Sequence, residues 1–130
     1  MADLRENGCA LLSSTAAVDL NTASDTDCYV VPVGKKCVVH YVVIRNLSAN
    51  ATNTVAMFGQ GAGFTDFVGN QTLSGLNAAG SAGVIMPIPN ATTVEIQEYT
   101  AGEIFSIDVT TVASIACTCT VDVYGSLADA

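Results

Sequence analysis

One run of apolar residues, from Cys37 to Ile44, constrains the fold more than any other stretch of the chain. It reads Cys-Val-Val-His-Tyr-Val-Val-Ile, too short for a membrane-spanning helix, which takes about 20 apolar residues. Valine and isoleucine lose side-chain freedom in a helix, so the run predicts a β-strand. Side chains of a strand alternate between its two faces. Strict alternation makes both faces apolar, with Cys37, Val39, Tyr41 and Val43 on one and Val38, His40, Val42 and Ile44 on the other.

A strand that is apolar on both faces needs a cover on each side. A second sheet is expected to cover one face. Two alternatives remain open for the other face: a neighbouring subunit, or the segment from Gly59 to Gly83. That segment is long for a loop and carries apolar side chains, as loops that contact partners often do. The candidate interface residues come from the second face and from this segment: Val38, His40, Val42, Ile44, Phe64 and Phe67.

The rest of the chain consists of short strand-like runs separated by turn residues, with no long stretch of helical periodicity. This pattern predicts an all-β chain, an antiparallel β-sandwich or jelly roll, in one domain. Residues 1–27 are expected to form a polar N-terminal arm with short strands, and residues 28–130 the sandwich. Apart from the extreme N-terminus, a helical turn is expected only at Leu76–Ser81. The expected strands are Cys9–Leu12, Ala16–Leu20, Cys28–Val31, Lys36–Asn46, Asn53–Phe58, Val84–Met86, Thr93–Glu98, Glu103–Val109 and Ser114–Tyr124.

The last expected strand has the clearest alternation of apolar and polar residues. Its apolar set is expected to face the core, and its polar set, which includes Asp122 and Tyr124, to form a wet or semi-polar face. The core set is Ile115, Cys117, Cys119, Val121 and Val123.

Charge and composition exclude several classes of partner. The chain has a net charge of −8 and only four Lys and Arg residues. Nucleic acids and anionic membranes both require clustered cations, so neither is expected as a direct partner. Half of the residues are apolar and 12% are charged, and surfaces so low in charge are typical of interfaces. The N-terminal residues lack an apolar signal segment, so we expect synthesis in a reducing cytosol and five free thiols.

The sequence offers no constellation of catalytic residues. His40, the only histidine, lies within the apolar strand, where a structural or interface role is typical. Cys37 faces the opposite side and cannot pair with it. Cys117 and Cys119 share a face but have no second pair to complete a zinc site, so they are expected in the core. The acidic segment Asp25 to Asp27 lacks the spacing of a calcium loop. We therefore expect no catalytic residue, no metal and no cofactor, and no enzymatic activity.

Residues 28 to 125 resemble a pattern of tailed-bacteriophage virion proteins. The resemblance begins at Val31-Pro32-Val33-Gly34-Lys35-Lys36, which leads into the β-branched run and then into Arg45-Asn46-Leu47-Ser48. It continues at Ala101-Gly102-Glu103-Ile104, which precedes a strand, and at the C-terminal strand that ends in Tyr124-Gly125. The segment from Gly59 to Gly83 and the number of cysteines depart from the pattern.

The resemblance implies a small β-sandwich that acts as a capsid decoration, or cement, protein. Such a protein would bind the major capsid protein at joints between its subunits, on the outer surface of the virion, after synthesis in the host cytoplasm. It would also associate with itself, and we expect a trimer in preference to a dimer, because closed trimers fit local three-fold positions. The alternative is a minor head-tail component, or a receptor-binding or carbohydrate-binding β-sandwich of the virion.

Overall fold

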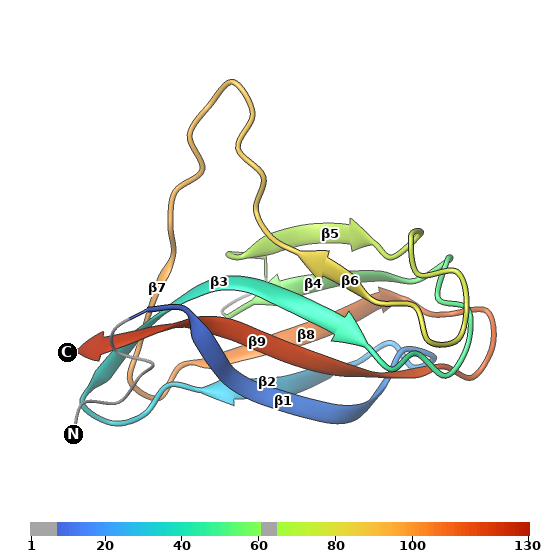
Figure 1. Ribbon diagram of the computed structural model, residues 1–130, viewed down its shortest axis with the longest axis horizontal. Helices are drawn as coiled ribbons and strands as arrows, with labels where there is room; N and C mark the ends of the chain where they lie inside the picture. The colour runs from blue at the N-terminus through green and yellow to red at the C-terminus, as the bar shows by residue number, and fades with distance from the viewer. Residues whose placement is uncertain (1–7, 61–64) are drawn as a thin grey trace.

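The computed structural model describes residues 8–60 and 65–130, and within these ranges the chain forms strands and no helix. No helix in the described part is therefore long and apolar enough to cross a membrane. The strands pack as two antiparallel sheets, which confirms the all-β prediction (Figure 1). The strands are β1 (Ala10–Asp19), β2 (Asp25–Val30), β3 (Lys35–Arg45), β4 (Val55–Gly59), β5 (Val68–Thr72), β6 (Gly83–Ile85), β7 (Glu98–Thr100), β8 (Ile104–Thr111) and β9 (Thr118–Asp129).

The two sheets have the strand order of a jelly roll. The first is β1-β9-β3-β6, with β7 also paired to β3, and the second is β2-β8-β4-β5. All of these pairings are antiparallel. Most connections cross from one sheet to the other, as in a double Greek key. The prediction of a single-domain, jelly-roll-like sandwich is therefore confirmed.

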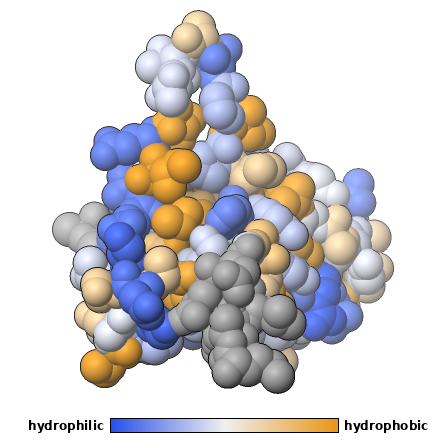
Figure 2. Space-filling view, turned by 60° about the vertical axis from the view of Figure 1, so that its left-hand side comes forward, coloured by the Kyte–Doolittle hydropathy of each residue, from blue (hydrophilic) through white to orange (hydrophobic). Residues whose placement is uncertain are grey.

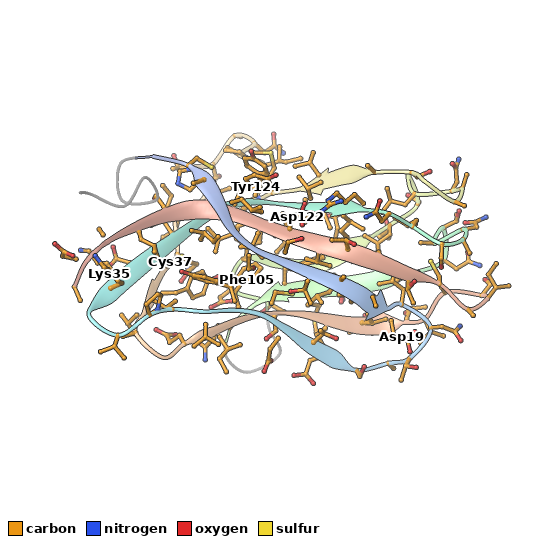
Figure 3. The ribbon with its side chains drawn as sticks, turned by 60° about the horizontal axis from the view of Figure 1, so that its bottom comes forward. Asp19, Lys35, Cys37, Phe105, Asp122 and Tyr124 are labelled. Carbon is orange, nitrogen blue, oxygen red and sulfur yellow. The ribbon has the colours of Figure 1, made fainter. Side chains whose placement is uncertain are left out.

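The core lies between the sheets and consists of alternating inward side chains. Cys37 of β3 and Phe105 of β8 point into this layer (Figure 3). Full burial of one such side chain stabilises a fold by about 1.5–3 kcal/mol. Cys117 and Cys119 are buried here, as expected, and burial raises the pKa of the Cys119 thiol to about 12. Ile115 departs from the prediction: it is 55% exposed because β9 begins only at Thr118.

Four predicted segments differ from the structure. Residues 10–19, expected to form two short strands in a polar arm, form the single strand β1, which pairs along β9 with two bulges. The long segment after Gly59 contains a strand, β5, paired to β4. The strand expected at residues 93–98 is absent apart from its last residue, Glu98, where β7 begins. Residues 76–81 form turns and not a helix.

Candidate functional site

An edge strand of the first sheet is interrupted in its middle. β6 pairs with residues 42–44 of β3, and β7 pairs with residues 36–38 of the same strand. Both pairings are antiparallel and lie on the same edge of β3, opposite β9, so β6 and β7 are two halves of one edge strand. Between them the chain leaves the sheet over residues 86–97 and returns. We call residues 86–97 the arm; it stands out from the sandwich as the tall orange excursion in Figure 1.

The arm leaves the sheet beside a β-bulge in β3. On the β9 side, Val39 pairs with Gly125 and Tyr41 pairs with Tyr124, so His40 is an extra residue with no pairing partner in β9. A bulge of this kind reverses the alternation of side chains beyond it. The absence of a side chain at Gly125 permits the bend, because a Cβ there would lie 2.3 Å from the Val38 carbonyl oxygen. The His40 Nε2 atom lies 3.2 Å from the Ser126 hydroxyl, which fixes the ring on the outer surface.

The arm exposes large apolar side chains along its length. Ile88 is 79% exposed and Ile96 is 74% exposed, and Met86 and Val94 are also exposed. Pro87 and Pro89 have no backbone N–H, so this part of the chain cannot continue the ladder of a sheet. Figure 2 shows apolar side chains gathered at the root of the arm and continuing down the face beneath it. Exposed apolar patches of this kind mark sites that contact other molecules.

A groove of about 440 Å³ runs between the arm and the bulge. One wall is β3 at the bulge, and the other is the arm itself. Phe67, just before β5, packs edge-on against Phe105 at a ring-centroid distance of 5.3 Å and closes another part of the groove. The groove is lined by Val38, Val39, His40, Tyr41, Asp66, Phe67, Met86, Pro87, Pro89, Val94, Glu95, Ile96 and Gln97.

The charged groups of the groove are acidic. Asp66 and Glu95 line it, and neither has an ion-pair partner among residues 8–60 and 65–130. Asp66 is held in place because its Oδ1 atom accepts hydrogen bonds from the Gln60 amide at 2.6 Å and the Tyr99 hydroxyl at 3.5 Å. Burial and the nearby Asp66 carboxylate raise the pKa of Tyr99 well above its usual range, so Tyr99 donates as a neutral phenol. The groove therefore presents fixed negative charge within an apolar setting.

The predicted interface residues fall into three groups. Val38, His40 and Phe67 all line the groove. Phe64 lies outside the described residues. Val42 and Ile44 are 0% exposed and point into the core, so the prediction that they share a face with Val38 and His40 is wrong. The bulge at His40 explains the error, because it moves the later residues of β3 to the opposite face.

Several residues of the groove were missed from sequence. The run from residue 84 to 98 contains isolated apolar residues and was expected to hold two strands. Pro87 and Pro89 were the available signal, since two prolines in so short a stretch exclude a continuous edge strand. The missed groove residues with exposed apolar side chains are Met86, Val94 and Ile96, and Ile88 is a further missed apolar residue of the arm outside the groove lining.

The side chains of this site suit binding. In the part of the chain that the structure describes, no group of three or more His, Cys, Asp or Glu side chains is placed to hold a metal ion. The buried thiols of Cys28 and Cys37 lie in the core, and burial raises the pKa of each to about 11. What the groove offers is an apolar channel, two carboxylates and an open strand edge.

No protein-family model and no curated protein matches the chain. Among solved structures, it is similar to a chain of the cyanophage Pam1 capsid asymmetric unit, with a TM-score of 0.50 and 18% identity over 92% of this chain and 82% of that chain. It is also similar to a chain of the acidic stable capsid of Helicobacter pylori bacteriophage KHP30, with a TM-score of 0.50 and 10% identity. That alignment covers 94% of this chain and 96% of the other. The sandwich fold is therefore one that occurs in chains of two bacteriophage capsid structures.

Proposed function

We propose that this chain is a structural virion protein that decorates an icosahedral phage capsid and stabilises it. In this proposal it binds on the outer surface, at joints between subunits of the major capsid protein, and has no catalytic role. The observation that carries the proposal is the arm, which is inserted into an otherwise complete jelly roll and exposes Ile88 and Ile96. The likeness in fold to chains of two phage capsid structures supports a virion setting.

Burial of the arm at a joint between subunits would favour binding. A large aliphatic side chain contributes up to about 1.5–3 kcal/mol when it moves from water to a fully buried position. Ile88 and Ile96 are both close to fully exposed, so most of this free energy is still available to a partner. Part of it offsets the loss of translational and rotational freedom on association. Icosahedral symmetry repeats the contact many times, so a modest affinity per site suffices.

We also infer that the protein acts as a homotrimer at local three-fold positions, with a dimer at two-fold positions as the alternative. Closed cyclic oligomers match the local symmetry of a shell, which supports this assembly. Sedimentation equilibrium of the purified chain distinguishes the three states, since monomer, dimer and trimer differ in mass by whole multiples.

Removal and re-addition test the proposed function. Parent phage particles are stripped of the protein, incubated with purified wild-type chain, and heated while release of DNA is recorded. Stripped particles should open at a lower temperature than native ones, and the wild-type chain should restore the native value. Unchanged heat stability after stripping would contradict the proposal.

A matched pair of variants tests whether the arm is the binding element. Ile88→Asp with Ile96→Asp places charge on the arm, and Ile115→Asp places charge on the loop between β8 and β9, at the far end of the sandwich from β7 (Figure 1). All three side chains are more than half exposed, so every variant should fold. The arm variant should fail to restore heat stability, and the Ile115→Asp control should restore it.

A further inference from the structure

We infer that the groove between the arm and β3 binds an extended apolar segment of the capsid protein that carries a lysine or arginine. This inference rests on the proposed function and adds the chemistry of the partner. The segment's apolar side chains would pack between the arm and the bulge, and its cation would lie between Asp66 and Glu95. The capsid protein, and not a second copy of this chain, is the occupant to which the following observations point.

Charge is the first observation. Asp66 and Glu95 both line the groove, the first just before β5 and the second on the arm. Neither has a cationic partner among the described residues. The negative charge of Asp66 is fixed in position by the Gln60 amide, which donates to it at 2.6 Å. Charge complementarity of this kind selects a cationic partner and excludes an acidic one.

Within residues 8–60 and 65–130, the Lys and Arg side chains are already engaged in ion pairs, which argues against a second copy. Lys35 pairs with Asp129 at 2.8 Å, Lys36 with Glu98 at 3.7 Å, and Arg45 with Asp122 at 2.7 Å. These are the Lys and Arg residues that the structure describes, so another copy has no uncommitted cation among them. Two copies each with a net charge of −8 would instead place like charges together.

The strand edge is the second observation. β6 and β7 cover the edge of β3 at residues 42–44 and 36–38, which leaves residues 39–41 without a strand partner on that side among the described residues. Val39, His40 and Tyr41 also line the groove. An extended segment in the groove therefore meets backbone groups of β3 as well as side chains, which is the arrangement used when a partner adds to a sheet edge.

A peptide titration tests the chemistry without the particle. The isotope-labelled full chain is titrated with a short acetylated peptide that alternates valine with lysine, and with a matched peptide that has glutamate in place of lysine. We expect saturable shifts of the NMR signals of residues 38–41 and of the arm with the lysine peptide, and none with the glutamate peptide. Equal responses to both peptides, shifts confined to other surfaces, or no shifts would each overturn the inference.

Variants of the two groove carboxylates test where the lysine of the peptide binds. Asp66→Asn combined with Glu95→Gln should raise the dissociation constant of the lysine peptide about fivefold, the effect of losing one good ion pair at a partly exposed site. Asp25→Asn is the control: it removes a carboxylate charge from the exposed end of β2 and should leave the dissociation constant unchanged. An unchanged constant for the groove variant, or an equal loss for the control, would contradict the assignment.

Rebinding to stripped particles separates this inference from the proposed function. Wild-type rebinding should weaken as salt concentration rises, and rebinding of the Asp66→Asn, Glu95→Gln variant should be weaker and less dependent on salt. Failure of the wild-type chain to rebind would overturn the proposed function. Normal rebinding of the variant with unchanged salt dependence would overturn only the inference. Self-association of the purified wild-type chain that disappears in the variant would also overturn it, because this result would assign the groove to a second copy.

Discussion

Asp122 carries a charge on the outer face of β9 although only 4% of its surface is exposed (Figure 3). Arg45 donates from Nε to its Oδ2 atom at 2.7 Å, and Ser14 donates to its Oδ1 atom at 2.6 Å. Burial opposes the ionised carboxylate, but the two hydrogen bonds and the charge of Arg45 outweigh it and lower the pKa of Asp122. The three residues belong to β1, β3 and β9, so this network links three neighbouring strands.

Replacement of this carboxylate should destabilise the fold. At pH 7 Asp122→Asn should lower the free energy of unfolding by about 1–3 kcal/mol, because a buried hydrogen bond to a charged group is weakened. In the wild type, the contribution of Asp122 to the free energy of unfolding is complete above about pH 3.9, the pKa of an aspartate in the unfolded chain. It is lost as pH falls through the lowered pKa of Asp122 in the folded protein. Urea unfolding across this acidic range measures both effects. If Asp122→Asn is as stable at pH 7 as the control variant Asp25→Asn, the account is contradicted.

Gly125 is required by the bulge. A Cβ at this position would lie 2.3 Å from the Val38 carbonyl oxygen and 3.1 Å from the Val39 Cα atom, both of which are backbone atoms. Gly125→Ala should therefore lower the free energy of unfolding by about 1–3 kcal/mol or more, as expected for overpacking against a rigid neighbour. Gly75→Ala is the matched control, since no atom lies within 4 Å of a Cβ there. Equal stability of the two variants in urea unfolding would show that the bulge does not need glycine.

The cysteines should react in two classes. Cys9 is exposed, and the other four are buried: Cys28, Cys37, Cys117 and Cys119. Burial raises the pKa of Cys28 and Cys37 to about 11, so these two are also protonated at neutral pH. A thiol reagent should label Cys9 alone in the folded protein and all five cysteines after unfolding without reductant. A count of one or three in the unfolded protein would reveal disulfides.

At the scale of elements, the arm is an insertion that the sheet does not need. If residues 87–96 are deleted, Met86 and Gln97 remain between Ile85, which pairs with Val42, and Glu98, which pairs with Val38. Two residues then face Val39 and Tyr41, with His40 bulged out, so β6 and β7 can form one continuous edge strand.

Deletion of residues 87–96 should therefore preserve the fold while abolishing binding. We expect an unchanged far-UV circular dichroism spectrum and a free energy of unfolding within about 1 kcal/mol of wild type, since shortening a loop changes closure entropy only modestly. The deleted protein should no longer restore stripped particles. An unfolded deletion variant would show that the arm is part of the folding unit, and full restoration of the particles would contradict its role in binding.

The elements show which features local sequence determines. Alternation and turn residues predicted most strands and the two-sheet architecture, because each depends on residues close together in the chain. Which side chains of β3 face the core beyond His40 could not be predicted in this way. His40 is bulged because Gly125 of β9 accepts the close approach, and that partner is far away in sequence. The bulge moves Val42 and Ile44 into the core and leaves Val38, Tyr41 and Val43 half-buried on the outer face, which therefore remains largely apolar.

The arm shows a second limit of prediction. Residues 93–98 have an apolar alternation suited to a strand, and only Glu98 adopts it. A strand needs a neighbour with open hydrogen-bonding groups, and β6 and β7 leave room for only a short link along β3. Of the candidate interface residues in the described ranges, Val38, His40 and Phe67 converge because the groove forms where the two sheets and the arm meet.

At the scale of the molecule, a closed core coexists with an exposed apolar arm and an acidic surface. The core accounts for the fold by itself, whereas the arm places Ile88 and Ile96 in water. The net charge of −8 favours a cationic partner. These properties together suit a protein that stays soluble until it meets a repeated site on a larger assembly.

An electron cryomicroscopy reconstruction of the parent phage particle tests the central claim most directly. The account predicts density for this sandwich on the outer surface, with the arm at a joint between capsid protein subunits. It also predicts an extended capsid segment in the groove, with a lysine or arginine between Asp66 and Glu95. A reconstruction in which the sandwich contacts the shell through another face, with the arm directed into solvent, would contradict the account.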